Sequence, residues 1–209
     1  RGVKVVLGGM HPSFLPEEAG QHADAVVIGE AEGIWPHLIE DGKAGRLMKV
    51  YSQEKKPDPD CWPSPQRDLF VKSGYLIPGM VSTSRGCPFS CSFCSASSFF
   101  GRTYRTRPLD AIVDEFDQLK KDRYLFFGDD NIVGNPEFAK ELFRALIPYK
   151  KKWAAQASVG VGKDEELIEL AARSGCIVMF IGFESVSQES LKLINKRANK
   201  VEEYEEVVR

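Results

Sequence analysis

The chain has 209 residues, of which 43% are hydrophobic and 28% charged, a balance typical of a globular protein. The formal net charge of −2 gives no basic footprint of the kind that favours nucleic-acid binding. The charge therefore does not indicate a nucleic-acid partner. No apolar run approaches the ~20 residues that cross a bilayer, so we expect no transmembrane segment.

The first and last residues of the chain each lie within a stretch that reads as regular secondary structure. Arg1 is not a methionine and leads directly into a strand-like run, and Arg209 ends an acidic amphipathic stretch. We therefore expect an internal fragment of a longer protein.

Residues 1–40 predict strand, glycine turn, short helix, strand and helix. The two strands, Val3–Leu7 and Ala25–Ile28, are continuous apolar runs of the kind that is buried on both faces in a parallel sheet. Gly8-Gly9 follows the first strand and Gly29-Glu30 follows the second. Residues 41–77, by contrast, contain a proline-rich stretch without a period and are interpreted as a linker.

Residues 78–209 predict four strands that alternate with helices. The predicted strands are Met80–Ser84, Tyr124–Phe127, Trp153–Val159 and Ile177–Phe183. The predicted helices span 108–120, begin at Asn135-Pro136, run from Asp164 to Ser174-Gly175, and begin near Ser187. This alternation indicates βα units and a parallel sheet, whose functional residues gather at the carboxyl ends of the strands.

Three of the five cysteines, Cys87, Cys91 and Cys94, fall in one loop after the first of these strands. An odd number of clustered cysteines is a poor disulfide framework and a good metal site, and it indicates a reducing, cytoplasmic compartment. Three close thiolates without a fourth nearby favour an iron–sulfur cluster with one open iron. The alternative is zinc, which usually takes paired Cys-x-x-Cys motifs or histidines.

Acidic residues follow two other strands. Asp129 and Asp130 end the second strand of this half, and Glu184 comes directly after an apolar strand, where a charge is expected only beside a polar site. The alternatives are a loop that caps the next helix for the aspartates and an exposed turn for Glu184. Gln156 and Ser158 are weaker candidates on the third strand.

The run Cys87-Pro88-Phe89-Ser90-Cys91-Ser92-Phe93-Cys94 resembles the Cys-x-x-x-Cys-x-aromatic-Cys signature of radical S-adenosylmethionine (SAM) enzymes. Phe93 stands at the aromatic position, and Thr83-Ser84-Arg85-Gly86 resembles the lead-in of that family. The resemblance implies a [4Fe–4S] cluster on the three cysteines. It also implies reductive cleavage of SAM to methionine and a 5′-deoxyadenosyl radical.

The resemblance extends to the acidic strand ends. Gly128-Asp129-Asp130-Asn131 resembles the Gly-Gly-Glu-like segment of the family, in the Asp-Asp form of its cobalamin-dependent members. It implies that Asp129 or Asp130 binds the ammonium of the methionine moiety. Gly182-Phe183-Glu184-Ser185 resembles a Gly-Ile-Glu-Ser segment, so Glu184 is expected to bind the ribose or methionine end of SAM.

The first forty residues resemble the second half of a cobalamin-binding Rossmann-like domain. Gly8 and Gly9 would let the backbone approach the nucleotide tail of cobalamin, and His11 is given no cobalt role. The implied fold class is α/β. A half cobalamin domain (1–40) and a linker (41–77) would precede the first four βα units of a partial (β/α)6 TIM-like barrel (78–209).

The resemblance implies a cobalamin-dependent radical SAM enzyme, for which C-methylation of a lipid or another small-molecule natural product is expected. An electron donor such as flavodoxin or ferredoxin would be its partner. One rival is a radical SAM enzyme whose first domain has lost cobalamin, as in methylthiotransferase-like enzymes or cyclases. The other is a non-catalytic iron–sulfur electron carrier, which predicts a fourth cysteine ligand.

Overall fold

The computed structural model describes residues 2–69, 71, 74–75, 79–119 and 121–209, and the chain divides into two compact units, Arg1–Pro63 and Ser64–Arg209. In these ranges no helix combines the length and the apolar character that crossing a membrane requires.

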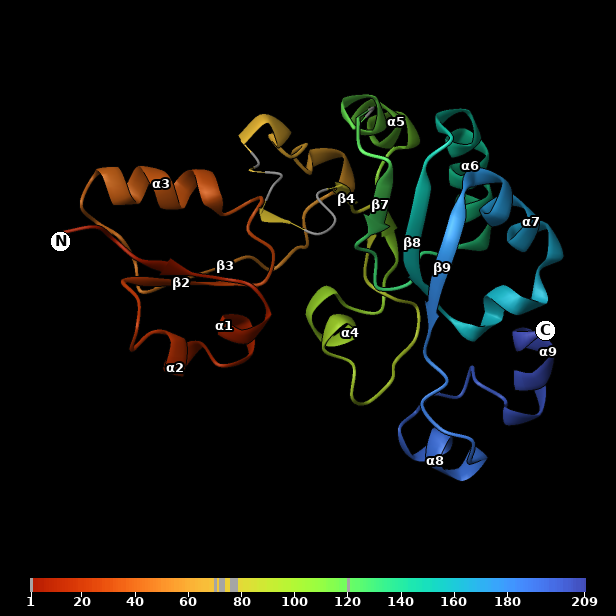
Figure 1. The fold of residues 1–209 in the computed structure, drawn as a ribbon. Coiled ribbons are helices and arrows are strands. Elements are labelled where there is room, and N and C mark those ends of the chain that lie inside the picture. Colours follow the sequence, from red (N-terminus) through yellow and green to blue (C-terminus); the bar gives the residue numbers. More distant parts are fainter. Residues whose placement is uncertain (1, 70, 72–73, 76–78, 120) are drawn as a thin grey trace. The chain divides into compact units, whose positions relative to one another are not determined.

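The first unit is a three-stranded parallel sheet with helices on both faces. Its strands lie in the order β1–β2–β3, and Figure 1 shows α3 on one side of them and α1 with α2 on the other. The core consists of Ala25, Val27, Ile34, Leu38 and Tyr51. The elements are β1 (Val6–Leu7), α1 (Met10–Phe14), α2 (Pro16–Ala19), β2 (Ala25–Ile28), α3 (Trp35–Lys43) and β3 (Val50–Ser52).

The third strand of this unit lies inside the segment 41–77 that the sequence indicated as a linker. In β3 the central Tyr51 is buried while its two neighbours are exposed, and its hydroxyl donates to Asp41 Oδ2 at 3.0 Å. Three residues are too few for an alternation to be recognised in a sequence. The first unit therefore extends to Pro63, and the predicted strand Val3–Leu7 shortens to β1 because Val3 and Val5 are exposed.

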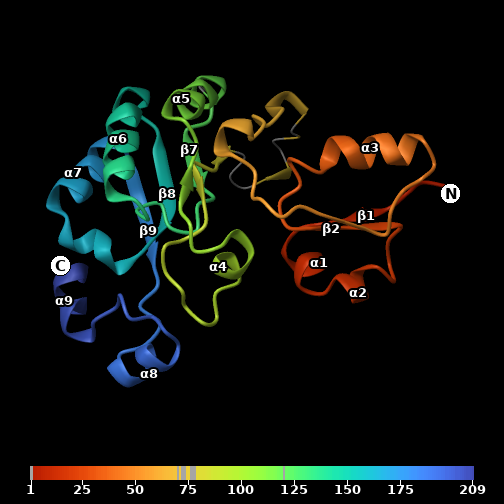
Figure 2. The same ribbon diagram turned by 180° about the vertical axis from the view of Figure 1, so that it is seen from behind.

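The second unit is built on a four-stranded parallel sheet in the order β4–β7–β8–β9. Three helices, α5, α6 and α7, cover one side of this sheet, as Figures 1 and 2 show from opposite directions. The strands are β4 (Gly79–Val81), β7 (Tyr124–Phe127), β8 (Lys152–Ala157) and β9 (Cys176–Ile181). The helices are α5 (Leu109–Gln118), α6 (Pro136–Leu146) and α7 (Glu165–Ser174).

The helix ends follow the capping rules that the sequence indicated. The Asn135 side chain accepts the Phe138 N–H at the start of α6, and the Asp164 side chain accepts the Leu167 N–H at the start of α7. Gly175 ends α7 with a φ of 103°, and a Cβ there would lie 1.9 Å from the Lys151 carbonyl oxygen. The caps fix where α6 and α7 begin, and only glycine fits at the turn between α7 and the strand that follows it.

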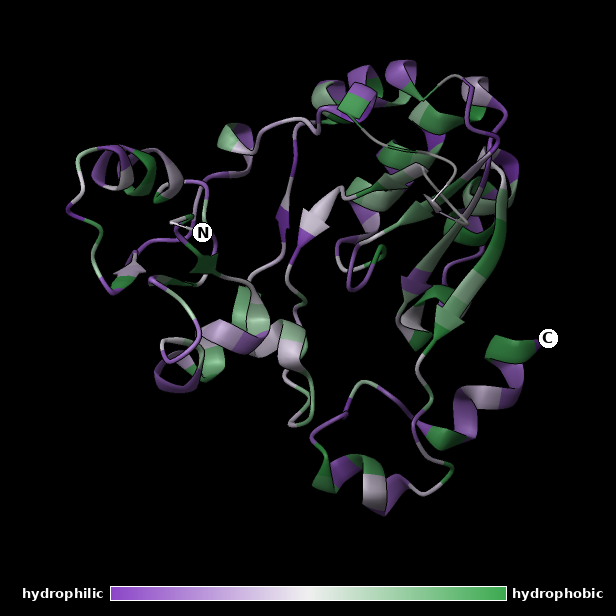
Figure 3. Ribbon diagram, turned by 60° about the vertical axis from the view of Figure 1, so that its left-hand side comes forward, coloured by the Kyte–Doolittle hydropathy of each residue, from purple (hydrophilic) through white to green (hydrophobic). Residues whose placement is uncertain are grey.

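The helix-covered side of the sheet contains the main core. Strand residues Leu125, Phe127 and Trp153 pack there against helix residues such as Phe116 and Phe143. The other side of the sheet is more exposed: in β9, Ile177, Val178 and Phe180 are 52%, 41% and 56% exposed. Figure 3 shows hydrophobic residues along much of these strands, and β8 also contains the polar Lys152 and Gln156.

The predicted strand Met80–Ser84 is divided in the structure. After β4 the chain leaves the parallel sheet, and β5 (Ser84–Arg85) pairs antiparallel with β6 (Arg105–Thr106). The cysteine loop and the short helix α4 (Ser95–Phe100) lie between β5 and β6. After β9 come α8 (Gln188–Leu193) and α9 (Tyr204–Val208), and short 3-10 turns lie at 59–61, 67–69, 147–149, 159–163 and 201–203.

Candidate cofactor site at the cysteine loop

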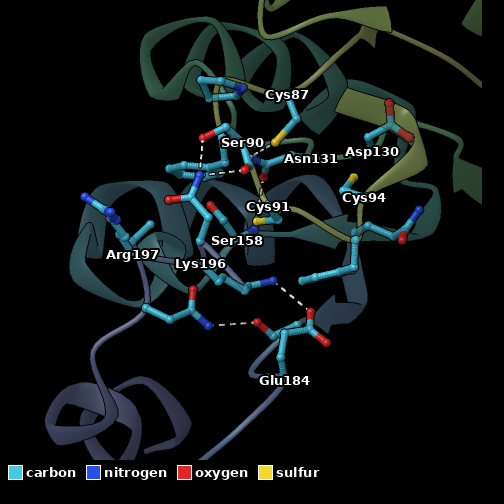
Figure 4. A pocket seen from close by; sticks show the side chains of 18 of the residues that line it. Cys87, Ser90, Cys91, Cys94, Asp130, Asn131, Ser158, Glu184, Lys196 and Arg197 are labelled. Atoms are coloured by element: carbon cyan, nitrogen blue, oxygen red, sulfur yellow. Dashed lines mark hydrogen bonds and ion pairs between the residues drawn. The ribbon is translucent and has the colours of Figure 1, made fainter. Parts of the chain in front are cut away.

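The three cysteines of the loop line one cavity of about 340 Å³ in the second unit. Cys87, Cys91 and Cys94 are all free thiols and half-buried, and Cys94 is the residue that precedes α4. Figure 4 shows them on one wall of the cavity, with Asp130, Ser158, Glu184 and Lys196 around it. The cavity lies at the carboxyl ends of the strands, where parallel sheets place their ligands.

Asp129 fixes the entrance of the cysteine loop. Its carboxylate is fully buried and accepts hydrogen bonds from the Thr83 N–H at 3.1 Å, the Thr83 hydroxyl at 2.8 Å and the Ser84 hydroxyl at 2.5 Å. Burial raises its pKa, and these hydrogen bonds, of which that from Ser84 is the largest, oppose the rise. Asp129 does not line the cavity and instead braces the chain between β4 and β5.

Asp130, the next residue, lines the cavity and is half-buried. Burial raises the pKa of its carboxyl, and a hydrogen bond from the backbone of Gly86 opposes that shift. Gly86 has a φ of 88°, and a Cβ there would lie 2.2 Å from the Thr103 carbonyl oxygen, so only glycine fits. The start of the cysteine loop thus contacts the strand end that presents Asp130.

Glu184 enters the cavity from the chain that follows β9. Its φ of 63° is a left-handed conformation unusual for this residue type. Its Oε1 lies 2.8 Å from Lys196 Nζ, and the Lys196 ammonium lies 5.8 Å from the centre of the Phe93 ring. The wall opposite the cysteines therefore carries one ion pair, and the exposed Arg197 lines the same cavity.

The segment after α8 holds the middle of the cysteine loop. The Asn195 amide nitrogen donates to the carbonyl oxygen and to the hydroxyl oxygen of Ser90, both at 2.8 Å. The Ser92 N–H donates to the Ile194 carbonyl at 2.9 Å. We call these three hydrogen bonds the clamp, and Figure 4 shows its Ser90 part as dashed lines.

Asn131 lies beside the first cysteine. Its side chain is buried, its Oδ1 accepts the Ser158 N–H at 3.0 Å, and its Nδ2 lies 3.9 Å from Cys87 Sγ. The Gln156 and Ser158 side chains, named in the sequence as weaker candidates, line the same cavity. One cavity wall is thus formed by the ends of β7 and β8.

A sequence model of the Radical SAM superfamily matches residues 81–209. These residues contain the cysteine loop and the strands β7, β8 and β9 of the parallel sheet. The chain belongs to the radical SAM superfamily.

Two curated relatives of this radical SAM chain come from Chlorobaculum tepidum. The bacteriochlorophyllide d C-12(1)-methyltransferase is 34% identical over 100% of this chain and 48% of its own length. The bacteriochlorophyllide d C-8(2)-methyltransferase is 30% identical over 100% of this chain and 50% of its own length. The chain therefore spans about half the length of these relatives.

Two solved structures of TsrM, a radical SAM methyltransferase from Kitasatospora setae, share the fold of the chain. One, with tryptophan substrate and the SAM analogue aza-SAM bound, gives a TM-score of 0.78 at 22% identity over 99% of this chain and 47% of TsrM. The other, with cobalamin and a [4Fe–4S] cluster bound, gives 0.76 at 19% identity over 100% of this chain and 47% of TsrM. The likeness covers both units of the radical SAM chain.

The structure brings together most of the site residues that the sequence indicated for this radical SAM chain. Cys87, Cys91, Phe93, Cys94, Asp130 and Glu184 line one cavity. Asp129 does not line it, and Gly8 and Gly9 lie in the first unit at the end of β1. There Gly9 has a φ of 94°, and the Ser13 hydroxyl links the Gly9 carbonyl to the Gly29 N–H.

Residues that the sequence did not indicate also line the cavity. Asn131 follows Asp130 after β7, and the sequence named it only as the last residue of the Gly128–Asn131 segment, without a role of its own. Asn195 and Lys196 lie beyond a predicted helix, where no pattern in the sequence relates them to the cysteines. Three further residues lie outside the cavity. His11, given no cobalt role, pairs with Glu18 at 2.7 Å between His11 Nε2 and Glu18 Oε2. Cys61 is exposed in a 3-10 turn, and Cys176 is half-buried in β9.

The donor set fits an iron–sulfur cluster. Three soft thiols on one loop are the usual ligands of such clusters, and burial raises the pKa of Cys87 and Cys91, a cost that a cationic metal centre removes. In the described ranges no three His, Cys, Asp or Glu side chains are arranged to hold a single metal ion.

Proposed function

We propose that the complete protein is a cobalamin-dependent radical SAM enzyme that methylates a carbon of a lipid or another small-molecule natural product. The observation that carries this proposal is the cavity itself, in which three free thiols face a carboxylate from one strand end and a Glu–Lys pair from another. Membership of the radical SAM superfamily and methyltransferase relatives that match the whole chain support it.

In this proposal Cys87, Cys91 and Cys94 hold a [4Fe–4S] cluster that leaves one iron open to SAM. When bound, the cluster supplies the electron that cleaves SAM to methionine and a 5′-deoxyadenosyl radical. The chain's own residues position SAM and exclude water from the cavity.

Asp130 is the residue proposed to accept hydrogen bonds from the ammonium of the methionine moiety. It is the aspartate of the pair that lines the cavity, and its partial burial would strengthen a charge-assisted hydrogen bond. Glu184 is proposed to bind the ribose or methionine end of SAM, which requires its ion pair with Lys196 to open or to be shared. Phe93 and Phe180 supply apolar surface to the cavity.

The first unit is proposed to be the second half of a cobalamin-binding Rossmann-like domain, and the second unit the first four βα units of a partial (β/α)6 barrel. The parallel sheet, the left-handed Gly9 at the end of β1 and the fold shared with cobalamin-bound TsrM support this assignment. Gly8 and Gly9 would approach the nucleotide tail of cobalamin, and a flavodoxin or ferredoxin would supply electrons.

The core of the proposal is tested by anaerobic reconstitution of the complete protein with iron and sulfide. We expect an EPR signal of a reduced [4Fe–4S] cluster and 5′-deoxyadenosine from SAM under dithionite. A Cys87/Cys91/Cys94 triple alanine variant should lose both, whereas a Cys61/Cys176 double alanine variant should keep both. Retention of the cluster by the triple variant would contradict the ligand assignment.

The methyl-transfer part is tested separately by cobalamin retention and product mass. Purified complete protein supplied with cobalamin should retain it through gel filtration, and SAM labelled in its methyl group should label the product. 5′-Deoxyadenosine formation without bound cobalamin or label would instead indicate a radical SAM enzyme of another reaction class. A fourth cysteine ligand and no deoxyadenosine would indicate an electron carrier.

A further inference from the structure

Asn131 is held by the backbone at the end of β7, and its amide has one allowed orientation. The side chain is 3% exposed, and the Ser158 N–H points at it from 3.0 Å. Because an N–H only donates, the acceptor that it meets must be the amide oxygen of Asn131. The amide NH₂ therefore points the other way, toward Cys87 Sγ at 3.9 Å.

The backbone around Asn131 prevents the amide from turning away. The next residue, Ile132, donates its N–H to the Gln156 carbonyl at 2.9 Å, and Gly134 donates to the Asn131 carbonyl at 3.0 Å. Rotation of the side chain would leave the Ser158 N–H without its acceptor, which is unfavourable for a part-buried donor. The NH₂ group is thus preorganised beside the Cys87 sulfur.

A hydrogen-bond donor beside a ligating sulfur stabilises the reduced and the oxidised states of a cluster to different extents. Sulfur carries more negative charge in a reduced cluster than in an oxidised one, so an N–H donor stabilises the reduced state and raises the reduction potential. Asn131 does not touch SAM in this account and acts only through Cys87. It sits in the sequence directly after Asp130, so one strand end would serve both the substrate side and the cluster side of the cavity.

We propose that Asn131 is a positioning residue that raises the reduction potential of the [4Fe–4S] cluster through an N–H···S hydrogen bond to Cys87. The proposal rests on the proposed function only in requiring a cluster on the three cysteines. It does not depend on cobalamin, on the substrate or on methyl transfer.

The test is an EPR-monitored redox titration of the reconstituted complete protein and of two variants. Asn131→Asp keeps the acceptor for the Ser158 N–H and replaces the donor by a carboxylate oxygen, and Asn131→Ala removes the whole amide. In each variant we expect the equilibrium to shift about tenfold or more toward the oxidised cluster, which for a one-electron couple is 59 mV. The shift should be larger for Asn131→Asp, because it adds a negative charge.

Asn135→Asp is the matched control. It makes the same chemical change four positions later, at the exposed cap of α6, where aspartate caps as well as asparagine and solvent screens its charge. Its cluster potential should equal that of the unchanged protein. Circular dichroism of all three variants checks that the fold is retained.

Equal potentials in the unchanged protein and both Asn131 variants, with the cluster loaded in each, would overturn this inference and leave the proposed function standing. Loss of the cluster in both variants with the fold retained would also overturn the inference. Asn131 would then be needed to bind the cluster and not to set its reduction potential. If one variant fails to fold or to load, the other decides. If the unchanged protein loads no cluster, the proposed function fails and the inference fails with it.

Discussion

Asp129 and Asp130 are adjacent in the sequence and have different surroundings. One carboxylate is fully buried under the chain between β4 and β5, and the other lines the cavity. Successive side chains of an extended strand point to opposite sides, so a pair of acids at a strand end divides between two environments. The sequence indicates the pair, but the side that each residue faces depends on where the strand ends.

Substituting each aspartate in turn should therefore separate an effect on SAM binding from an effect on the free energy of unfolding. Asp130→Asn removes a charge-assisted partner and should weaken SAM binding about tenfold, with little change in the free energy of unfolding. Asp129→Ala leaves three buried donors unpaired and should lower that free energy by roughly 3 kcal/mol. Isothermal titration with SAM and urea denaturation measure the two effects, and weaker SAM binding by Asp129→Ala alone would contradict the assignment.

Glu115 is a second buried carboxylate, and its role is structural. It is 1% exposed in α5 and accepts from two guanidinium groups, that of Arg67 and that of Arg107 at 2.5 Å. Glu115→Ala would leave both cations without this carboxylate, and we expect a loss of roughly 3–5 kcal/mol in the free energy of unfolding. Asp114→Ala, an exposed neighbour on the same helix, should change it by less than about 0.5 kcal/mol. Equal losses in the two variants would refute this account.

At the scale of elements, the long helices and central strands were predictable and the short elements were not. The helix α6 begins at the predicted cap, α7 ends at the predicted glycine, and β7 has the predicted bounds, because capping residues and apolar runs are local signals. The strands β3, β5 and β6 have two or three residues, too few to show a period. Their pairing depends on partners distant in the sequence.

The clamp connects an element at the end of the chain to the cysteine loop, and no local pattern in the sequence indicated it. Asn195 has a φ of 55°, which asparagine, aspartate and glycine tolerate. Asn195→Gly keeps this backbone and removes the donor, whereas Asn195→Asp places a carboxylate against the Ser90 carbonyl. We expect a chelator to remove iron several-fold faster from both variants, and fastest from Asn195→Asp.

Lys192→Ala, an exposed change on α8, is the control for the clamp. Iron release from this variant should match that from the unchanged protein. Unchanged release rates in both Asn195 variants would show that the loop holds its shape without the Ser90 contacts.

The start of α7 should respond to acid. Two hydrogen bonds hold the pKa of Asp164 below its usual value of 3.8. The larger effect comes from Lys140, whose Nζ lies 2.9 Å from Asp164 Oδ2, and the smaller from the Leu167 N–H. A carboxyl whose pKa is lower in the folded state contributes stability above its unfolded pKa, and this contribution is lost as the pH falls below about 4. Asp164→Asn keeps the cap, so its melting temperature should fall less than that of the unchanged protein between pH 5 and pH 2.5. Parallel pH profiles of the two proteins would contradict this expectation.

At the scale of the whole molecule, the chain consists of two units that can be considered separately. All the residues of the cavity belong to the second unit, and the proposed cobalamin glycines belong to the first. A chain of residues 64–209 should therefore bind as much iron per molecule as the 209-residue chain after reconstitution. Iron analysis and EPR measure this, and cluster binding only in the presence of residues 1–63 would show that the first unit is needed to form the site.

Substrate choice was not predictable at this scale, and the structure explains why. The lining groups with a proposed role are those expected to hold a cluster and SAM, and none of these roles distinguishes one carbon acceptor from another. The matched relatives act on different positions of bacteriochlorophyllide d, and this chain spans about half of their length.

The clamp joins residues that are 105 positions apart in the chain. A ribosome adds about 5–20 residues per second, so the loop would emerge roughly 5–20 s before the side chain that fixes it. During that interval the three thiols are exposed on an unfinished chain and vulnerable to oxidants. If these thiols hold the proposed cluster, iron and sulfide are best delivered after synthesis has passed Asn195, and low oxygen should matter most during translation itself.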